Sequence, residues 1–218
     1  MSVPLPTVRT GGQILIQVLC QQQVRHVFCV PGESYLSALD ALHDAADITT
    51  VVCRHEGGAA MMAEACGKLT GRPSVCFVTR GPGATNAASG IHVAAQDSTP
   101  LVLLIGQVSR DALGREAFQE IDYGLFYNAL AKHVEQVHDV ARLPEVMSRA
   151  FHTACNGRPG PVVVVLPEDV LSDSAQVVDL PEYHRLHSEP APADMARFAT
   201  LLANARQPVL LAGGRNWS

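Results

Sequence analysis

A strand-to-helix turn holds the side chain best suited to chemistry. The segment Cys53-Arg54-His55-Glu56 runs into Gly57 and Gly58, so a carboxylic acid opens a helix with free space beside it. Carboxylic acids can exchange a proton with a bound ligand. Glu56 could also simply open the helix, where a carboxylate gains about 0.3 to 1 kcal/mol from the helix dipole. The local spacing leaves both interpretations open.

A second glycine-rich turn, TRGPGATN (79–86), follows another apolar run and places Asn86 one turn into the next helix. Such a turn could hold a ligand on its backbone N–H groups. It has neither the G-x-x-x-x-G-K-[ST] spacing of a phosphate loop nor the G-x-G-x-x-G spacing of a dinucleotide site. An ordinary tight turn between strand and helix is the alternative.

The elements that must position these turns alternate between strand and helix patterns. Apolar residues at helical spacing predict helices over 11–23, 33–45, 56–69, 81–96 and 143–156. Short β-branched runs predict strands over 26–30, 48–53, 74–79, 101–106, 132–137 and 161–167. We therefore expect an α/β domain of three layers, α/β/α, around a six-stranded, mostly parallel sheet.

Right-handed crossovers would bring the carboxyl ends of these strands to one edge of the sheet, where ligands bind in such folds. The loops expected at that edge are 31–34, 53–57, 79–83 and 106–110.

The pattern changes near the carboxyl end. We predict one domain over 1–172, a proline-containing linker over 173–192, and the truncated start of a second α/β domain over 193–218. That start consists of a helix over 193–205 and a strand over 208–214.

Composition narrows the classes of function. The net charge of −5 comes with no basic run, so we expect neither nucleic acid nor a membrane surface as partner. The six cysteines lie mostly in apolar runs without metal-ligand spacing, so we expect no metal site. No segment has the roughly 20 apolar residues of a membrane span, and we expect a cytoplasmic protein.

Seven motifs occur in an order that resembles a known family. They are VPG at 30–32, RHEGGAA at 54–60, GPGATN at 81–86, DSTPLVLLIGQV at 97–108, AFQEID at 117–122, KHVEQV at 132–137 and NGRPGPVVVVLPED at 156–169. Over roughly residues 10–172 the chain resembles the amino-terminal pyrimidine-binding domain of thiamine-diphosphate-dependent enzymes, in particular acetolactate (acetohydroxyacid) synthases. PVLLAGG at 208–214 resembles the first strand of their central domain.

The resemblance implies roles for individual residues. Glu56 would hydrogen-bond N1′ of the aminopyrimidine and activate the cofactor. The residues implied to contact the cofactor are Pro31, Gly32, Glu56, Pro82 and Asn86. Those implied near the substrate are Glu33, Phe118 and Gln119. None of the nine histidines is expected to be catalytic, and the side chain of His55 should point away from the site.

The resemblance also implies cofactors and partners. They are thiamine diphosphate, Mg²⁺ bound by a domain absent from this chain, a small-molecule 2-oxo acid, and a homodimer or homotetramer in the full-length protein. The chain alone would be inactive. Open alternatives are a 2-oxo-acid decarboxylase or acyltransferase of the same superfamily, or a non-catalytic nucleotide-binding module.

Three positions depart from the synthase pattern. Glu33 replaces a small residue, Gly57 replaces a glutamine, and Glu168 replaces a lysine associated with flavin contact. The loss of the lysine at Glu168 argues against bound FAD and against a strict biosynthetic acetohydroxyacid synthase. The acid at Glu33 changes the substrate pocket, so the substrate stays undetermined.

Overall fold

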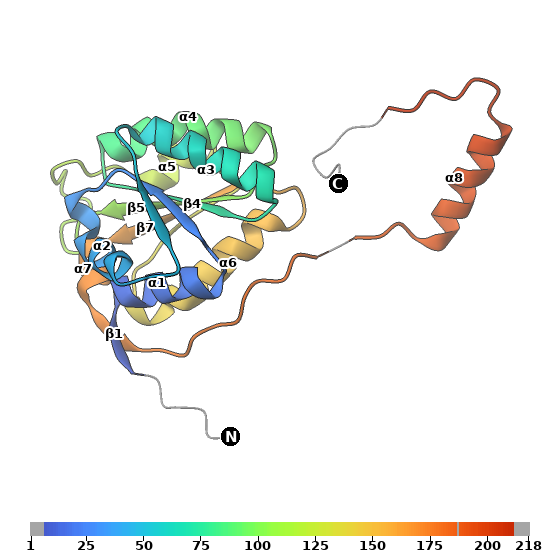
Figure 1. Ribbon diagram of the computed structural model, residues 1–218. Helices are drawn as coiled ribbons and strands as arrows, with labels where there is room; N and C mark the ends of the chain where they lie inside the picture. The colour runs from blue at the N-terminus through green and yellow to red at the C-terminus, as the bar shows by residue number, and fades with distance from the viewer. Residues whose placement is uncertain (1–6, 187, 212–218) are drawn as a thin grey trace, which may run out of the picture. The chain divides into compact units, whose positions relative to one another are not determined.

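The computed structural model describes residues 7–186 and 188–211 (Figure 1). The chain divides after His184 into two compact units, which are described separately. The division falls inside the linker predicted over 173–192.

The first unit is built on a six-stranded sheet. Its strands are β2 (His26–Cys29), β3 (Thr49–Val52), β4 (Ser74–Val78), β5 (Leu101–Gln107), β6 (His133–Gln136) and β7 (Pro161–Pro167). They lie in the order β3-β2-β4-β5-β7-β6, and every neighbouring pair is parallel. The central strands β4, β5 and β7 are buried throughout, which explains why their sequences are continuous apolar runs.

Helices cover both faces of this sheet. They are α1 (Gly11–Gln21), α2 (Leu36–His43), α3 (Glu56–Thr70), α4 (Pro82–Gln96), α5 (Tyr123–Tyr127), α6 (Leu143–Cys155) and α7 (Glu168–Ser172). Helices α1, α2 and α6 lie on one face and α3, α4 and α5 on the other (Figure 1). Along β4, Val75 and Phe77 pack in the core of the first face, and Cys76 and Val78 pack in the core of the second. The predicted three-layer α/β fold with a parallel six-stranded sheet is confirmed.

Several short elements were not predicted. The helix expected over 33–45 begins with a 3₁₀ turn, Glu33–Tyr35, ahead of α2, and a second 3₁₀ turn, Val140–Arg142, precedes α6. Helix α5 lies between the predicted strands over 101–106 and 132–137, where no helix was predicted. Strands β1 (Val8–Thr10) and β8 (Ser174–Gln176) pair antiparallel, so the segment expected to be linker starts as a strand. This pairing joins residues far apart in sequence, which local patterns cannot reveal.

The second unit contains α8 (Pro192–Asn204), close to the predicted helix over 193–205, and none of its residues is buried. The strand expected over 208–214 is wrong over 208–211, which have no strand conformation. The apolar side chains of Val209, Leu210 and Leu211 are exposed, and within residues 7–186 and 188–211 no strand pairs with this segment to supply the ladder that an extended segment requires. Residues 212–214 lie outside the described part of the chain. Among the described residues no helix has the length and apolarity needed to cross a membrane.

Candidate active site

The four loops expected at one edge of the sheet do meet there. Ser34 Oγ lies 2.7 Å from Thr79 Oγ1, which joins the loops after β2 and β4. A Cβ added to Gly106, near the end of β5, would lie 2.3 Å from Ser34 Oγ. A Cβ added to Gly83 would lie 3.4 Å from Glu56 Oε1, so the loop after β3 also borders this place. The expectation of a shared edge is confirmed.

Glu56 is the first residue of α3 and is half-buried. Asn86 Nδ2, from α4, donates a hydrogen bond of 2.9 Å to Glu56 Oε2. Among the described residues Glu56 Oε1 has no hydrogen-bond partner, and it faces the glycine at 83. The space beside the helix at Gly58 is open, because an added Cβ there would meet nothing within 4 Å. One carboxylate oxygen is therefore oriented and the other is available to a ligand.

His55 has a structural role beside this carboxylate. Its Nδ1 accepts a hydrogen bond of 3.0 Å from the backbone N–H of Gly57, which caps α3. Because the ring uses Nδ1 for the cap, the imidazole is engaged with its own backbone rather than with Glu56.

The other residues predicted to touch the cofactor lie on the same edge. Pro31 is exposed at the end of the loop after β2, and Gly32 packs so closely that an added Cβ would lie 2.4 Å from Thr79 Cβ. Pro82 is the exposed first residue of α4 and follows Gly81, whose φ of 61° suits glycine. These turns bring backbone close to the space in front of Glu56.

The residues predicted near the substrate flank the loop after β4. Gln119 adopts a left-handed conformation, φ 64°, and its Cβ would lie 2.6 Å from a Cβ on Gly81. The side chain of Phe118 is exposed, while its backbone oxygen accepts a 3.3 Å hydrogen bond from Arg80 Nε. Glu33 is exposed and also reaches Arg80.

Arg80 is the residue that the sequence analysis missed. Its side chain is only 10% exposed, and its guanidinium donates to Glu33 Oε1 at 2.9 Å and to Glu168 Oε2 at 3.1 Å. The available signal was an arginine two residues after the apolar run over 75–78, because a charge in such a place needs partners.

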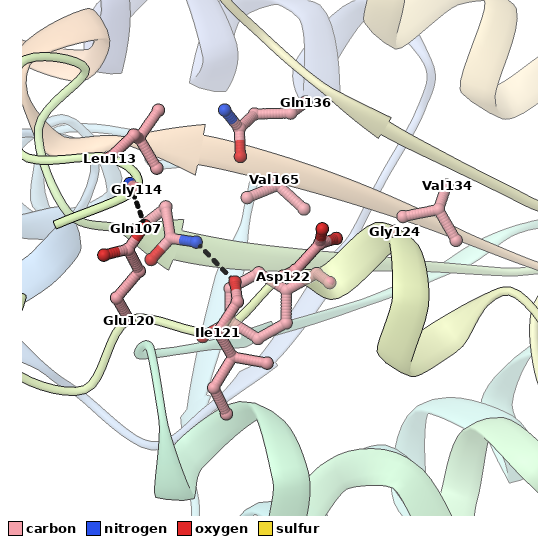
Figure 2. A pocket seen from close by; sticks show the side chains of 11 residues that line it. Gln107, Leu113, Gly114, Glu120, Ile121, Asp122, Gly124, Val134, Gln136 and Val165 are labelled. Atoms are coloured by element: carbon pink, nitrogen blue, oxygen red, sulfur yellow. Dashed lines mark hydrogen bonds between the residues drawn. The ribbon is translucent and has the colours of Figure 1, made fainter. Parts of the chain in front are cut away.

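Two cavities lie at this side of the molecule. The larger, about 450 Å³, is bordered by Gln107, Glu120 and Asp122 and holds none of the predicted site residues (Figure 2). Figure 2 shows the amide of Gln107 bonded to the backbone oxygen of Ile121. Hydrogen bonds from backbone N–H groups, chiefly that of Gly114, lower the pKa of Glu120. The polar side chains Gln107 and Glu120 thus hydrogen-bond the backbone of the loop that borders this cavity. We therefore do not assign the functional site to this cavity on the basis of its size.

The second cavity, about 420 Å³, is lined by Glu33, Ser34, Ser109, Glu168 and Asp169 among others. It borders the ion pairs of Arg80, so we take it as the one that belongs to the candidate site. Neither cavity is lined by Glu56, which lies among exposed neighbours.

Comparison with known proteins identifies the family of this chain. The family model described as "Thiamine pyrophosphate enzyme, N-terminal TPP binding domain" matches residues 9–125. The chain is 37% identical over 212 residues to the chloroplastic acetolactate synthase of Arabidopsis thaliana, and 39% identical over 206 residues to the acetolactate synthase isozyme 2 large subunit of Escherichia coli (strain K12). It is 38% identical over 210 residues to the acetolactate synthase of Mycobacterium bovis.

These alignments cover 94% of this chain but 32%, 37% and 34% of the three relatives, so the chain spans about a third of their length. The family match covers more than half of the chain and includes both turns of the candidate site. The chain belongs to the thiamine pyrophosphate enzyme family, as its N-terminal TPP-binding domain.

Proposed function

We propose that Glu56 binds N1′ of the aminopyrimidine of thiamine diphosphate, within an acetolactate synthase-like enzyme that acts on 2-oxo acids. The observation that carries this proposal is the asymmetry of the carboxyl group. Asn86 fixes one of its oxygens at 2.9 Å, and the other has no partner among the described residues. A carboxyl group held in this way can share a proton with a ring nitrogen without losing its orientation.

The residues present fit an aromatic ring at this position. The added Cβ at Gly83 would come within 3.4 Å of Glu56 Oε1, so glycine leaves room for a ring to approach that oxygen. The turn at Pro31-Gly32 would place backbone against the ring edge, and Pro82 and Asn86 would line the pocket. When bound, thiamine diphosphate supplies the nucleophilic carbon that attacks the carbonyl of the 2-oxo acid.

In this proposal Glu56 is the residue of this chain that exchanges a proton with the cofactor. Its Oε1 would share a proton with the ring nitrogen, while Asn86 keeps the carboxyl group in place. Glu33, Phe118 and Gln119 would lie toward the substrate. The close approach of Gln119 to Gly81 supports the placement of Gln119 near the substrate, because the loop that holds Gly81 continues to Gly83, which lies beside Glu56.

We propose that the diphosphate and its Mg²⁺ are held outside this chain. Glu56 and Asn86 offer too few oxygen ligands for Mg²⁺, which prefers six. Residues near Glu56 such as Pro82 and Asn86 are exposed, so a ring bound there would be covered by this chain on one side and open to solvent on the other. This supports a homodimer or homotetramer in which a second subunit covers the open side. Glu168, a carboxylate already paired with Arg80, does not favour an anionic flavin dinucleotide there.

Other parts of the proposal concern the whole protein. Residues 1–172 would be the pyrimidine-binding domain, 173–192 the linker and 193–218 the start of a central domain; the change of compact unit after His184 supports this division. The acetolactate synthase relatives favour carboligation over simple decarboxylation. We place the protein in the cytoplasm, where buried thiols such as Cys29 and Cys76 stay reduced.

The test is turnover of the full-length protein with thiamine diphosphate and Mg²⁺, comparing wild type with Glu56→Gln. Glutamine keeps the size and a hydrogen bond but cannot exchange the proton, so the rate should fall by about 10²- to 10⁴-fold. Calorimetric titration with thiamine diphosphate and a thermal unfolding scan check that the variant still binds the cofactor and folds. Equal rates in a folded variant would end the proposal for Glu56.

A further inference from the structure

Arg80 joins three separate loops at the candidate site. Its guanidinium binds Glu33 from the loop after β2, Glu168 at the start of α7, and the backbone oxygen of Phe118. The arginine side chain is 10% exposed, whereas those of Glu33 and Glu168 are 66% and 42% exposed. The cation is thus buried beneath the two carboxylates, and a molecule approaching from solvent meets the carboxylates first.

The charges of this cluster do not cancel. Two carboxylates share one guanidinium, which leaves a formal charge of −1. The adjoining cavity of about 420 Å³ adds Asp169, whose partner Arg110 is shared in turn with Asp173. No arginine or lysine is among the residues that line this cavity. The region facing solvent is therefore acidic, although Arg80 beneath it is positive.

The cluster and Glu56 border the same loop. Arg80 follows Thr79, whose hydroxyl is 2.7 Å from that of Ser34, the neighbour of Glu33. Thr79 Cγ2 would also lie 2.7 Å from a Cβ on Gly83, and that same Cβ would be 3.4 Å from Glu56 Oε1. Because Glu56 would hold the ring of the cofactor, a substrate bound to that cofactor would lie at the same edge of the sheet as the acidic cluster.

We propose that Glu33 and Glu168, held by Arg80, determine specificity by making the substrate side of the site negative. They favour an uncharged carbonyl compound, such as an aldehyde, as the acceptor over a second 2-oxo acid. This inference rests on the proposed function and names its acceptor class. A carboxylate on the acceptor is repelled by the net charge of the cluster, whereas an aldehyde is not.

The two acceptors give products that one assay can separate. With pyruvate as donor, acetaldehyde yields acetoin and a second pyruvate yields acetolactate. In both reactions the donor loses CO₂, one carbon–carbon bond forms to the carbonyl carbon of the acceptor, and the acceptor oxygen takes up one proton. Because the donor is the same, any effect of a substitution on donor binding or cofactor binding cancels in the product ratio.

The experiment measures this ratio by NMR for the full-length holoenzyme given pyruvate and acetaldehyde together. Glu33→Gln and Glu168→Gln should each shift the ratio toward acetolactate by about fivefold, the size expected for removing one partly exposed like charge near a carboxylate. Glu182→Gln is the matched control, because Glu182 is 40% exposed and paired with Arg72, which precedes β4 at the opposite edge of the sheet. The control should leave the ratio unchanged.

A ratio that stays within experimental error in both cluster variants, or moves toward acetoin, overturns the inference. If neither variant folds, the product ratio of the wild-type enzyme is measured at low and at high KCl instead. Salt screens the charge of the cluster, so high KCl should move the ratio toward acetolactate. A ratio that does not change with KCl contradicts the charge effect. Failure of the proposed function is distinguishable, because it would appear as equal turnover in wild type and Glu56→Gln whatever the product ratio.

Discussion

At the scale of single residues, the partner of each carboxylate at this sheet edge determines what it can do. Glu56 is held by a neutral amide, that of Asn86, which leaves one oxygen free to exchange a proton. Glu33 and Glu168 are both held by the guanidinium of Arg80, which fixes the two carboxylates side by side and suits them to electrostatic selection. The hydrogen-bond partner therefore separates the proposed roles of the three acids: proton exchange for Glu56, which binds Asn86, and charge selection for Glu33 and Glu168, which bind Arg80.

Glu145 gives a prediction about pH that belongs to this scale. Hydrogen bonds from Arg142 and Arg149 lower its pKa to about 2 in the folded protein. A carboxyl group whose pKa is lower folded than unfolded stabilises the fold above its unfolded pKa of about 4.5, and this contribution disappears as pH falls toward 2. Glu145→Gln should therefore destabilise the chain at pH 7 and make little difference near pH 2.

The measurement is the urea midpoint of wild type and Glu145→Gln at a series of pH values between 2 and 7. The gap between the two should be constant above about pH 5 and close between about pH 4.5 and 2. High salt should narrow it at every pH, because these side chains are exposed. A gap independent of pH would mean that glutamine acts through packing instead of charge.

At the scale of elements, the packing of α3 against α4 determines the distance between Glu56 and Asn86. A Cβ added to Gly90 in α4 would lie 2.5 Å from Ala60 Cβ and 2.7 Å from Ala60 C, so glycine lets the helices approach this closely. Gly90→Ala should destabilise the 218-residue chain by about 1–3 kcal/mol, because the helices must separate. That cost exceeds the roughly 1 kcal/mol that alanine gains in a helix.

Gly58→Ala is the matched control for this prediction. It makes the same change in α3, where an added Cβ would meet nothing within 4 Å. It should stabilise the chain by about 0.5–1 kcal/mol through helix propensity alone. Urea denaturation of both variants checks the opposite signs, and the same sign in both would show that the close approach at Gly90 has no energetic weight.

Elements were predictable from the sequence where a local pattern determines them. All six strands of the main sheet and its longer helices follow from apolar periodicity, because burial of the central strands imposes continuous apolar runs. Helix α5 has five residues, too few for a period to show. Strands β1 and β8 depend on pairing between the two ends of the unit, and the predicted strand at 208–211 lacks a neighbour.

In the candidate site, too, the sequence predicted what local motifs determine and missed what depends on contacts between distant segments. Motifs identified Glu56 and Asn86, but the hydrogen bond between them needs two helices brought side by side. Arg80 escaped notice because its partners, Glu33 and Glu168, come from turns that are remote in sequence and adjacent only across the sheet edge. A charge cluster of this kind is a property of topology, which a single motif does not carry.

At the scale of the whole molecule, the segment after β8 is held against the first unit by ion pairs, ring contacts and one buried amide. Gln22 is 2% exposed at the end of α1; its Nε2 donates to the oxygen of Pro181 at 3.1 Å, and its Oε1 accepts from the N–H of Tyr183 at 2.8 Å. Tyr183 also stacks on Phe151, with ring centroids 6.1 Å apart. The amide is therefore the buried polar contact that holds residues 181–183 against the end of α1.

Gln22→Leu should release this segment while leaving the sheet intact. Two hydrogen bonds of about 0.5–1.5 kcal/mol each are lost, so local opening next to Arg185 should become about tenfold more frequent. Trypsin cleaves after arginine and reports the population of the open form when opening is fast. Cleavage at Arg185 should accelerate by that factor, with Gln17→Leu, an exposed position on the same helix, as control. If both variants are cut at the wild-type rate, the stacking of Tyr183 holds the segment and the amide does not.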